Sequence, residues 1–235
     1  MKPVMARLNS LAPTLSVGLM AADMMRLSED LAALDGAGVG IIHFDVMDGC
    51  FCPSLTAGPP LIKGIRTDCL KDVHLMIANP LPKLADYAAA GADILTVHYE
   101  SEPTHIHRVF QVMQAMTNAN DPNRGIACGV ALNPGTPVEV IIPILELIDT
   151  VTLLAINPGW GGQRFDGCIE ARVAAVRRLT AGRSILVCVD GGITQQTIDQ
   201  AARMRPDVVV AGSAVFDGRA PADNARQLLA RLRSQ

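Results

Sequence analysis

The stretch GIIHFDVMDG, residues 40–49, decides how this sequence folds. It is a short apolar run with β-branched residues that ends in Asp and Gly, a pattern typical of a strand buried on both faces in a parallel sheet. His43 and Asp45 are two residues apart, so on a strand their side chains point to the same face. We therefore expect a buried strand that carries an imidazole and a carboxylate toward its carboxyl end.

Seven further apolar runs alternate with segments that have helical spacing of apolar residues. The eight expected strands lie within residues 11–17, 39–46, 71–77, 93–100, 126–133, 150–157, 184–192 and 207–214. The expected helices include residues 25–38, 80–92, 137–148, 168–180 and 194–204, and residues 118–125 are expected to form a loop. This alternation, without a two-residue hairpin signal, favours parallel strands and right-handed crossovers. Eight such units predict an α/β fold, a (β/α)₈ TIM barrel.

An open, doubly wound sheet is the alternative architecture. It is disfavoured because no G-x-G-x-x-G motif follows the first apolar run, and because polar strand ends are spread along the whole chain. With 235 residues, 49% of them hydrophobic and 18% charged, the chain is expected to form one domain, residues 1–235, with a large core.

Charge and cysteine content exclude several classes of function. The net charge is −3 and there is no basic run, so we expect no binding to nucleic acid or to a membrane surface. The sequence has no apolar run of membrane-spanning length, and we expect no secretory signal, because the start MKPVMARLNS lacks an apolar stretch and a small-residue cleavage site. Its six cysteines form no Cys-x-x-Cys pair, which indicates a reducing compartment, and we expect the cytoplasm.

Two more strand ends supply candidate metal ligands. His74 lies in KDVHLM and Asp190 in ILVCVDGG, and carboxyl ends of strands meet at one mouth of a barrel. Together with His43 and Asp45, they can bind one divalent ion, and mixed nitrogen and oxygen ligands suit zinc, iron, manganese or cobalt. Each residue alone could instead be a satisfied part of the core. For Asp48, in the turn VMDGC, a role as a loop acceptor and a functional role stay equally open.

Glycine-rich turns follow the last three strands of the expected barrel, in NPGWGGQRF, VDGGIT and VAGSAVF. Loops at these places in such barrels frequently bind phosphate through backbone N–H groups, often at a helix N-terminus. A single glycine pair is more often only a turn, but three of them in succession predict a phosphate site that needs no lysine.

In their order and spacing, HFDVMDG, DVHLMIANP, NPGWGGQRF, VDGGI and VAGSAVF resemble the ribulose-phosphate 3-epimerase family, over Leu11–Phe216. The paired H-x-D-x-M-D-G and D-x-H-L-M segments are the specific part of this resemblance. It implies one divalent metal ion held by His43, Asp45, His74 and Asp190. It also implies that Asp45 and Asp190 are the two catalytic acid–base groups.

The reaction implied by the resemblance is epimerisation at C3 of a ketose phosphate, D-ribulose 5-phosphate to D-xylulose 5-phosphate, through a cis-enediolate. Inversion removes a proton from one face of the carbon and returns one to the other face, so two bases must flank the substrate.

A D-allulose 6-phosphate 3-epimerase is the nearest alternative function, and a sugar-phosphate-binding module without catalysis is a second. A decarboxylase or aldolase would need a lysine among the catalytic strand ends, which have none. The implied partners are a small sugar phosphate and further copies of the chain, as a homo-oligomer.

The resemblance assigns a further set of residues to the substrate pocket: Thr14, Met47, Met76, Gly159, Gly161, Gly162, Gly191, Gly192, Gly212 and Ser213. The family's third methionine is Leu154 here, and Trp160 replaces Phe in GWGGQRF, a segment that resembles a mobile lid. His98 and Glu100 share a strand face and are expected to support the pocket.

Departures from the family pattern concern the pocket rim. A few extra residues within positions 16–23 follow the opening Ala-Pro-Thr, and Cys50, Cys52 and Ser54 replace the usual His, Val and Asn. These substitutions leave the choice between pentose and hexose phosphate open.

Overall fold

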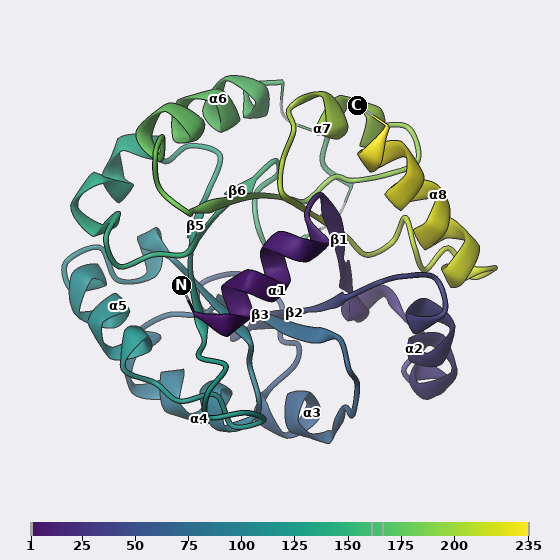
Figure 1. The fold of residues 1–235 in the computed structure, drawn as a ribbon, viewed down its shortest axis with the longest axis horizontal. Coiled ribbons are helices and arrows are strands. Elements are labelled where there is room, and N and C mark those ends of the chain that lie inside the picture. The colour runs from purple at the N-terminus through teal and green to yellow at the C-terminus, as the bar shows by residue number, and fades with distance from the viewer. Residues whose placement is uncertain (1, 161, 166, 235) are drawn as a thin grey trace.

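The computed structural model describes residues 2–160, 162–165 and 167–234, and its eight parallel strands close into one barrel, as predicted. Figure 1 shows the ring of strands with helices around it. The strands are β1 (Thr14–Gly18), β2 (Ile41–Met47), β3 (Leu70–Met76), β4 (Ile94–His98), β5 (Ala127–Leu132), β6 (Thr150–Leu154), β7 (Leu186–Asp190) and β8 (Val208–Ala211). The α-helices are α1 (Pro3–Leu11), α2 (Leu27–Asp35), α3 (Pro59–Gly64), α4 (Leu84–Ala89), α5 (Ile106–Gln114), α6 (Ile169–Leu179), α7 (Ile198–Arg203) and α8 (Pro221–Arg233). Short 3₁₀ helices are η1 (Leu19–Ala21), η2 (Leu81–Lys83), η3 (Tyr99–Ser101) and η4 (Val138–Ile144).

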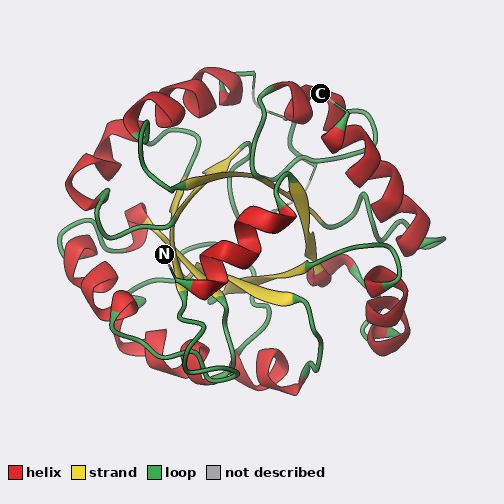
Figure 2. Ribbon diagram, in the orientation of Figure 1, coloured by secondary structure: helices red, strands yellow, loops and turns green. Residues whose placement is uncertain are grey.

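Each strand pairs with its neighbours in sequence, and β1 pairs with β8, which rules out an open sheet. Every residue of β3 is buried, because the strand has the barrel interior on one side and helices on the other. This two-sided burial is why most residues of the strands are apolar in the sequence. Figure 2 shows a ring of helices outside the strands and one helix over the barrel opening. Apolar side chains of the outer helices pack against the strands in the main core.

Helix α1 was not predicted from the sequence, and it lies across one mouth of the barrel (Figure 1). Its buried residues Val4, Met5 and Leu8 pack against the first residues of several strands, among them Ile41 and Leu70. Because strands begin at this end, α1 covers the amino-terminal mouth and leaves the carboxyl ends of the strands free for a site.

Most of the predicted helical segments contain helices, but residues 137–148 do not form an α-helix. This segment forms η4, which has Pro143 in its interior. A proline inside a helix has no N–H for the i to i−4 bond and its ring clashes with the preceding turn, which disfavours a regular α-helix over this segment. Residues 118–125 form a loop, as predicted. Within the described residues, every helix is too short or too polar to cross a bilayer.

Candidate metal centre and substrate cavity

Four side chains converge at the carboxyl end of the barrel. His43 and Asp45 lie on β2, His74 is level with Asp45 in the β2–β3 register, and Asp190 ends β7. One nitrogen or oxygen atom from each of the four lies within 4.8 Å of the others. Metal–ligand bonds to nitrogen and oxygen are about 2.0–2.2 Å long, so these four atoms could surround a single ion after small adjustments.

Imidazole nitrogens and carboxylate oxygens alternate within this cluster. His43 Nε2 lies 3.3 Å from Asp45 Oδ1 and 3.9 Å from Asp190 Oδ2. His74 Nδ1 lies 3.2 Å from Asp190 Oδ2 and 3.9 Å from Asp45 Oδ1. Both nitrogens are buried, and neither has a hydrogen-bond partner among the described residues. Buried polar atoms without partners are costly and rare, so their presence here fits a group that would bind between them.

A hydrogen-bond network orients His43 toward the cluster. Its Nδ1 lies 2.8 Å from Asp72 Oδ2, which also accepts a hydrogen bond of 2.8 Å from the Ser16 hydroxyl. Because the Asp72 carboxylate can only accept, His43 Nδ1 carries a proton, and the neutral form of the ring presents the Nε2 lone pair to the cluster. Such carboxylate–histidine pairs commonly hold metal-binding imidazoles in position.

A longer chain of contacts orients His74. Its Nε2 lies 2.9 Å from His98 Nε2, and His98 Nδ1 lies 3.1 Å from Glu100 Oε2. Glu100 Oε1 in turn accepts hydrogen bonds from the backbone N–H of Asn133 and from the Thr136 hydroxyl. As the carboxylate accepts, His98 donates from Nδ1 and accepts at Nε2, which makes His74 the donor at its own Nε2. The His74 Nδ1 lone pair therefore also faces the cluster.

The pKa values of the side chains in and beside the cluster differ from their usual values. Burial lowers the pKa of His43, but the carboxylates of Asp72 and Asp45 outweigh burial and hold that pKa well above its usual value. Burial raises the pKa of Asp45, and the opposing effect of His43 and His74 is larger, so the Asp45 pKa is lowered. In contrast, burial lowers the pKa of His98 to about 4, so its ring is neutral at pH 7. A neutral His98 is what the donor–acceptor order of the chain requires.

Two adjoining cavities of about 830 and 390 Å³ lie over the cluster, and both are lined by Asp45, Ile156, Asp190 and Gly191. The larger cavity is also lined by Gly162, Gly192, Gly212 and Ser213. The smaller cavity is also lined by Met47, Met76, Leu154 and Gly159. The structure thus places the glycine-rich turns on one side of the two carboxylates and an apolar wall on the other. Gly161, which was also predicted to bind substrate, lies outside the described residues.

Residues 14–216 match the sequence model of a protein family, the "Ribulose-phosphate 3 epimerase family". This chain belongs to the ribulose-phosphate 3-epimerase family. It is 39% identical over 202 residues to the ribulose-phosphate 3-epimerase of Rhodobacter capsulatus, covering 85% of this chain and 84% of that protein. The ribulose-phosphate 3-epimerase of Mycobacterium tuberculosis (strain ATCC 25618 / H37Rv) is 39% identical to this chain over 227 residues, which cover 95% of this chain and 93% of that protein. Among solved structures, KGPDC from Streptococcus mutans has a TM-score of 0.69 at 16% identity, over 94% of this chain and 98% of that one, a likeness of fold.

One residue assigned to the pocket by resemblance to the epimerase family lies elsewhere. Thr14 is the first residue of β1, fully buried and level with Val208 at the amino end of the barrel. The β1 residue at the cavity is Gly18, where a Cβ would lie 3.9 Å from Asp45 Oδ2. The resemblance assigned Thr14 to the pocket because it follows Ala-Pro, but Thr14 begins β1 and Gly18 ends it. β1 therefore contributes a glycine here instead of a hydroxyl.

The segment that resembles the epimerase lid is held by its own side chains. Gln163 accepts from the Asn157 N–H at 2.9 Å and donates to the Asn157 and Trp160 carbonyls at 2.7 and 3.0 Å. The Ser54 hydroxyl donates to the Gly159 carbonyl at 3.0 Å. Ser54, one of the residues that depart from the family pattern, thus ties the rim after β2 to this segment.

Sequence reasoning did not single out Asp72, Ser16 or Gly18. For Asp72 a signal existed, since it lies two residues before His74 and therefore faces the barrel interior with it. An aspartate inside a buried run needs a donor, and His43 on the adjacent strand is that donor.

Asp48, for which two roles were open, is a loop acceptor. Its Oδ1 accepts from the N–H groups of Cys50 and Phe51, both at 2.9 Å, and its Oδ2 accepts from the Ala78 N–H at 2.8 Å. Burial raises the pKa of Asp48, but these three N–H donors outweigh burial and lower it. The carboxylate therefore fastens the rim loop to the end of β3.

We expect Asp48→Ala to lower the free energy of unfolding at pH 7 by about 2 kcal/mol, since it removes three charge-assisted hydrogen bonds. Because the folded-state pKa is lowered, this contribution is present above the usual value of 3.8 and is lost as the pH falls through the lower folded value. Urea unfolding of both proteins at several pH values measures the difference. Asp217→Ala, which removes a single exposed N–H contact from Arg219, is the control and should cost less. A loss that is the same for both variants would contradict this role.

Proposed function

We propose that this protein is a metal-dependent ribulose-phosphate 3-epimerase that interconverts D-ribulose 5-phosphate and D-xylulose 5-phosphate within a single (β/α)₈ domain, residues 1–235. Family membership supports the activity. The observation that carries the mechanism is the cluster of His43, Asp45, His74 and Asp190, in which two buried imidazole nitrogens have no hydrogen-bond partner within the part of the chain that the structure describes. We further propose zinc, iron, manganese or cobalt as the metal, and a cytoplasmic homo-oligomer as the working form.

Asp45 and Asp190 are the proposed acid–base pair. They project from β2 and β7, two strands that are not neighbours in the barrel, and both line the two cavities over the cluster. A ketose between them could lose its C3 proton to one carboxylate and receive a proton on the opposite face from the other. A divalent ion bound by the four ligands would supply Lewis-acid stabilisation of the negative charge that develops on the substrate oxygens.

The remaining pocket residues would fix the ketose phosphate along the mouth. We propose that the phosphate binds beside Gly191, Gly192, Gly212 and Ser213, where backbone N–H groups follow β7 and β8. Met47 and Met76, with Leu154, would form the apolar wall beside the reacting carbon. That wall would exclude water, so that the deprotonated carbon would receive its proton from a carboxylate and not from solvent. Gly159, Gly161 and Gly162 would contribute from the lid-like segment.

His98 and Glu100 are proposed as positioning residues for His74. We expect His98→Asn to weaken metal affinity by about 10- to 100-fold, the usual effect of losing a partner that orients a ligand. Metal competition with a chromogenic chelator measures this affinity without reference to turnover.

The matched control for this variant is His105→Asn, because His105 and Glu102 form a similar contact of 3.0 Å on the exposed surface of the protein. We expect its metal affinity to equal that of the parent protein. Equal metal affinity in the His98 and His105 variants would exclude the positioning role.

Comparing kcat/KM for D-ribulose 5-phosphate and D-allulose 6-phosphate tests the assignment of substrate. We expect the pentose phosphate to be preferred, and a large preference for the hexose phosphate would reverse the assignment. Exchange of the C3 proton in deuterated water separates an enzyme from a binding module, since a module that only binds sugar phosphate produces no exchange.

A further inference from the structure

A large cavity lies at the amino-terminal end of the barrel, opposite the metal cluster. Its volume is about 970 Å³, near the upper end of the range of roughly 300–1,000 Å³ typical of small-molecule sites. It is bounded by α1, by the segment that joins α3 to β3, and by the loops that precede β4 and β5. None of its lining residues lines either cavity over the cluster.

Five cationic side chains line this cavity, although the chain as a whole carries a net charge of −3. They are Arg7, Lys63, Arg66, Lys71 and Arg124. The cavity has only two carboxylates, those of Asp68 and Asp93. Such a concentration of like charge in a concave surface raises the local potential and attracts anions.

The carboxylates of the cavity leave most of this charge uncompensated. Asp93 is almost fully buried and binds Arg124 at 2.8 Å, while its other oxygen accepts from the backbone N–H of Lys71. Arg7 donates to the backbone carbonyl of Asp68, and not to its carboxylate. Among the described residues, only Arg124 of the five cations forms an ion pair, so four positive charges stay available to a ligand.

Lys71 is the least expected of these cations, because it lies inside β3 and only 5% of its surface is exposed. Its ammonium donates to the Ile62 carbonyl at 2.6 Å, which uses one of its three N–H donors. Burial lowers its pKa, and Asp93 acts in the opposite direction. A buried lysine beside other cations is costly, and an anionic ligand would offset that cost.

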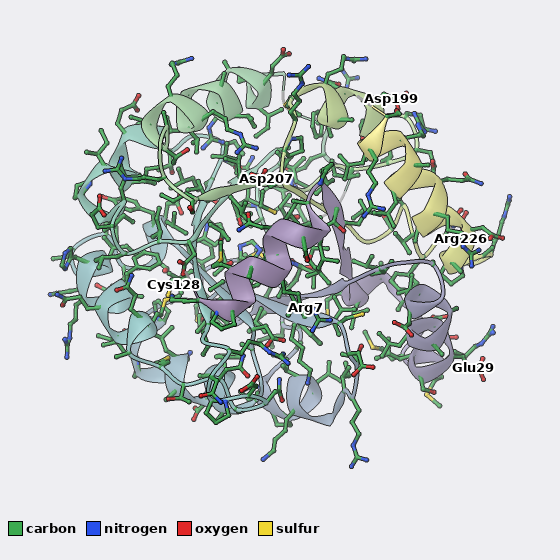
Figure 3. All side chains as sticks on the ribbon, in the orientation of Figure 1. Arg7, Glu29, Cys128, Asp199, Asp207 and Arg226 are labelled. Atoms are coloured by element: carbon green, nitrogen blue, oxygen red, sulfur yellow. The ribbon has the colours of Figure 1, made fainter. Side chains whose placement is uncertain are left out.

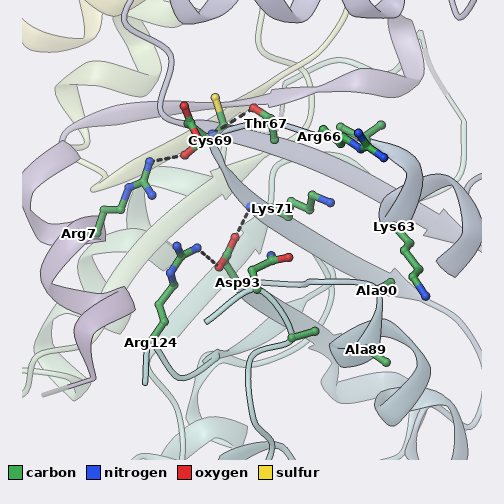
Figure 4. Close-up of a pocket in the computed structure, with 14 residues that line it drawn as sticks. Arg7, Lys63, Arg66, Thr67, Cys69, Lys71, Ala89, Ala90, Asp93 and Arg124 are labelled. Atoms are coloured by element: carbon green, nitrogen blue, oxygen red, sulfur yellow. Dashed lines mark hydrogen bonds and ion pairs between the residues drawn. The ribbon is translucent and has the colours of Figure 1, made fainter. Parts of the chain in front are cut away.

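Figure 4 shows Arg7 and Arg124 on one side of Lys71 and Asp93, and Lys63 and Arg66 on the other side. Arg7 reaches this place from α1, which Figure 3 shows across the barrel mouth. Cations on both sides suit a ligand with two separated anionic groups. We propose that this cavity binds a metabolite-sized anion carrying two phosphate groups, at a site separate from the epimerase centre.

Fructose 1,6-bisphosphate and fructose 6-phosphate are the probes, since they differ by one phosphate. Calorimetric titration of the metal-loaded full chain should show that the bisphosphate binds at least about tenfold more tightly, as expected for one additional charge-assisted contact. Hydrogen exchange with mass spectrometry locates the site, and we expect protection in residues 63–71 and 119–124. Protection confined to residues 156–165 and 190–213 would place the ligand at the epimerase mouth and overturn the proposal.

Charge reversal provides the second test. Lys63→Glu combined with Arg66→Glu changes two exposed residues and should weaken bisphosphate binding by about tenfold or more. Lys71→Met should weaken it as well, without adding a negative charge. The matched control is Arg108→Glu with Arg203→Glu, two exposed helical arginines remote from the cavity lining, and it should bind the probe as the parent does. Equal weakening in the control pair would show a general charge effect and no site.

Discussion

Replacing Asp45 or Asp190 by Asn is expected to lower kcat/KM for epimerisation by about 10⁴-fold, the upper end of the usual contribution of one acid–base group. Both carboxylates line the two cavities over the cluster, so each is available to the same substrate carbon. Asn keeps the size of the side chain but cannot take up a proton. Steady-state kinetics in both directions measures the loss, and Asp199→Asn, on α7, which alters an ion pair with Arg231 outside the cluster, is the control.

The two-base scheme also predicts a difference between the two variants that loss of structure would not produce. With one base left, a variant can still exchange the C3 proton of the epimer whose proton faces that base, but cannot exchange the proton of the other epimer. We therefore expect Asp45→Asn and Asp190→Asn to catalyse exchange in deuterated water on opposite epimers. Because both residues are also proposed ligands, metal content is measured in parallel. Exchange on the same epimer by both variants, each with bound metal, would exclude this scheme.

The sequence predicted the barrel because each strand is covered on both sides and therefore reads as a mostly apolar run. The elements it did not predict depend on tertiary contacts. In α1, Val4 and Leu8 are four residues apart, as on one helix face, but only the open end of the barrel gives them a surface to pack against. In η4, the apolar spacing of a helix is present, and Pro143 changes its hydrogen bonding.

The site was predictable where spacing on one strand or position at a strand end decided the geometry. His43 and Asp45 share a face, and Asp190 ends its strand, so their convergence with His74 followed from the barrel. The partners that orient the two imidazoles were harder to predict, because Asp72 and His98 reach them from neighbouring strands. The position of Thr14 could not be deduced from a motif, since a motif does not say where the strand begins and ends, and in β1 it is the last residue, Gly18, that lines the cavity.

Removing the metal is expected to destabilise the fold as well as to abolish activity. Loss of a ligand present at 100 to 1,000 times its Kd costs about 3–4 kcal/mol, which in a domain of this size lowers Tm by roughly 6–16 °C. Differential scanning calorimetry before and after dialysis against a chelator measures the shift. Adding back Zn²⁺, Mn²⁺, Fe²⁺ or Co²⁺ separately should restore Tm and activity together, and the most effective ion identifies the metal.

The loss of Tm on removal of the metal should depend on pH because His43 titrates. In the metal-free protein its pKa is raised above the usual 6.5, so its contribution to stability is complete below pH 6.5 and is lost as the pH rises through the raised value. A proton on His43 then partly replaces the cation at low pH and cannot do so at high pH. The loss of Tm on chelation should consequently be larger at pH 8 than at pH 6. In His43→Asn this pH dependence should disappear. If chelation lowers the Tm of the parent protein equally at pH 6 and pH 8, no cation occupies the position that faces His43.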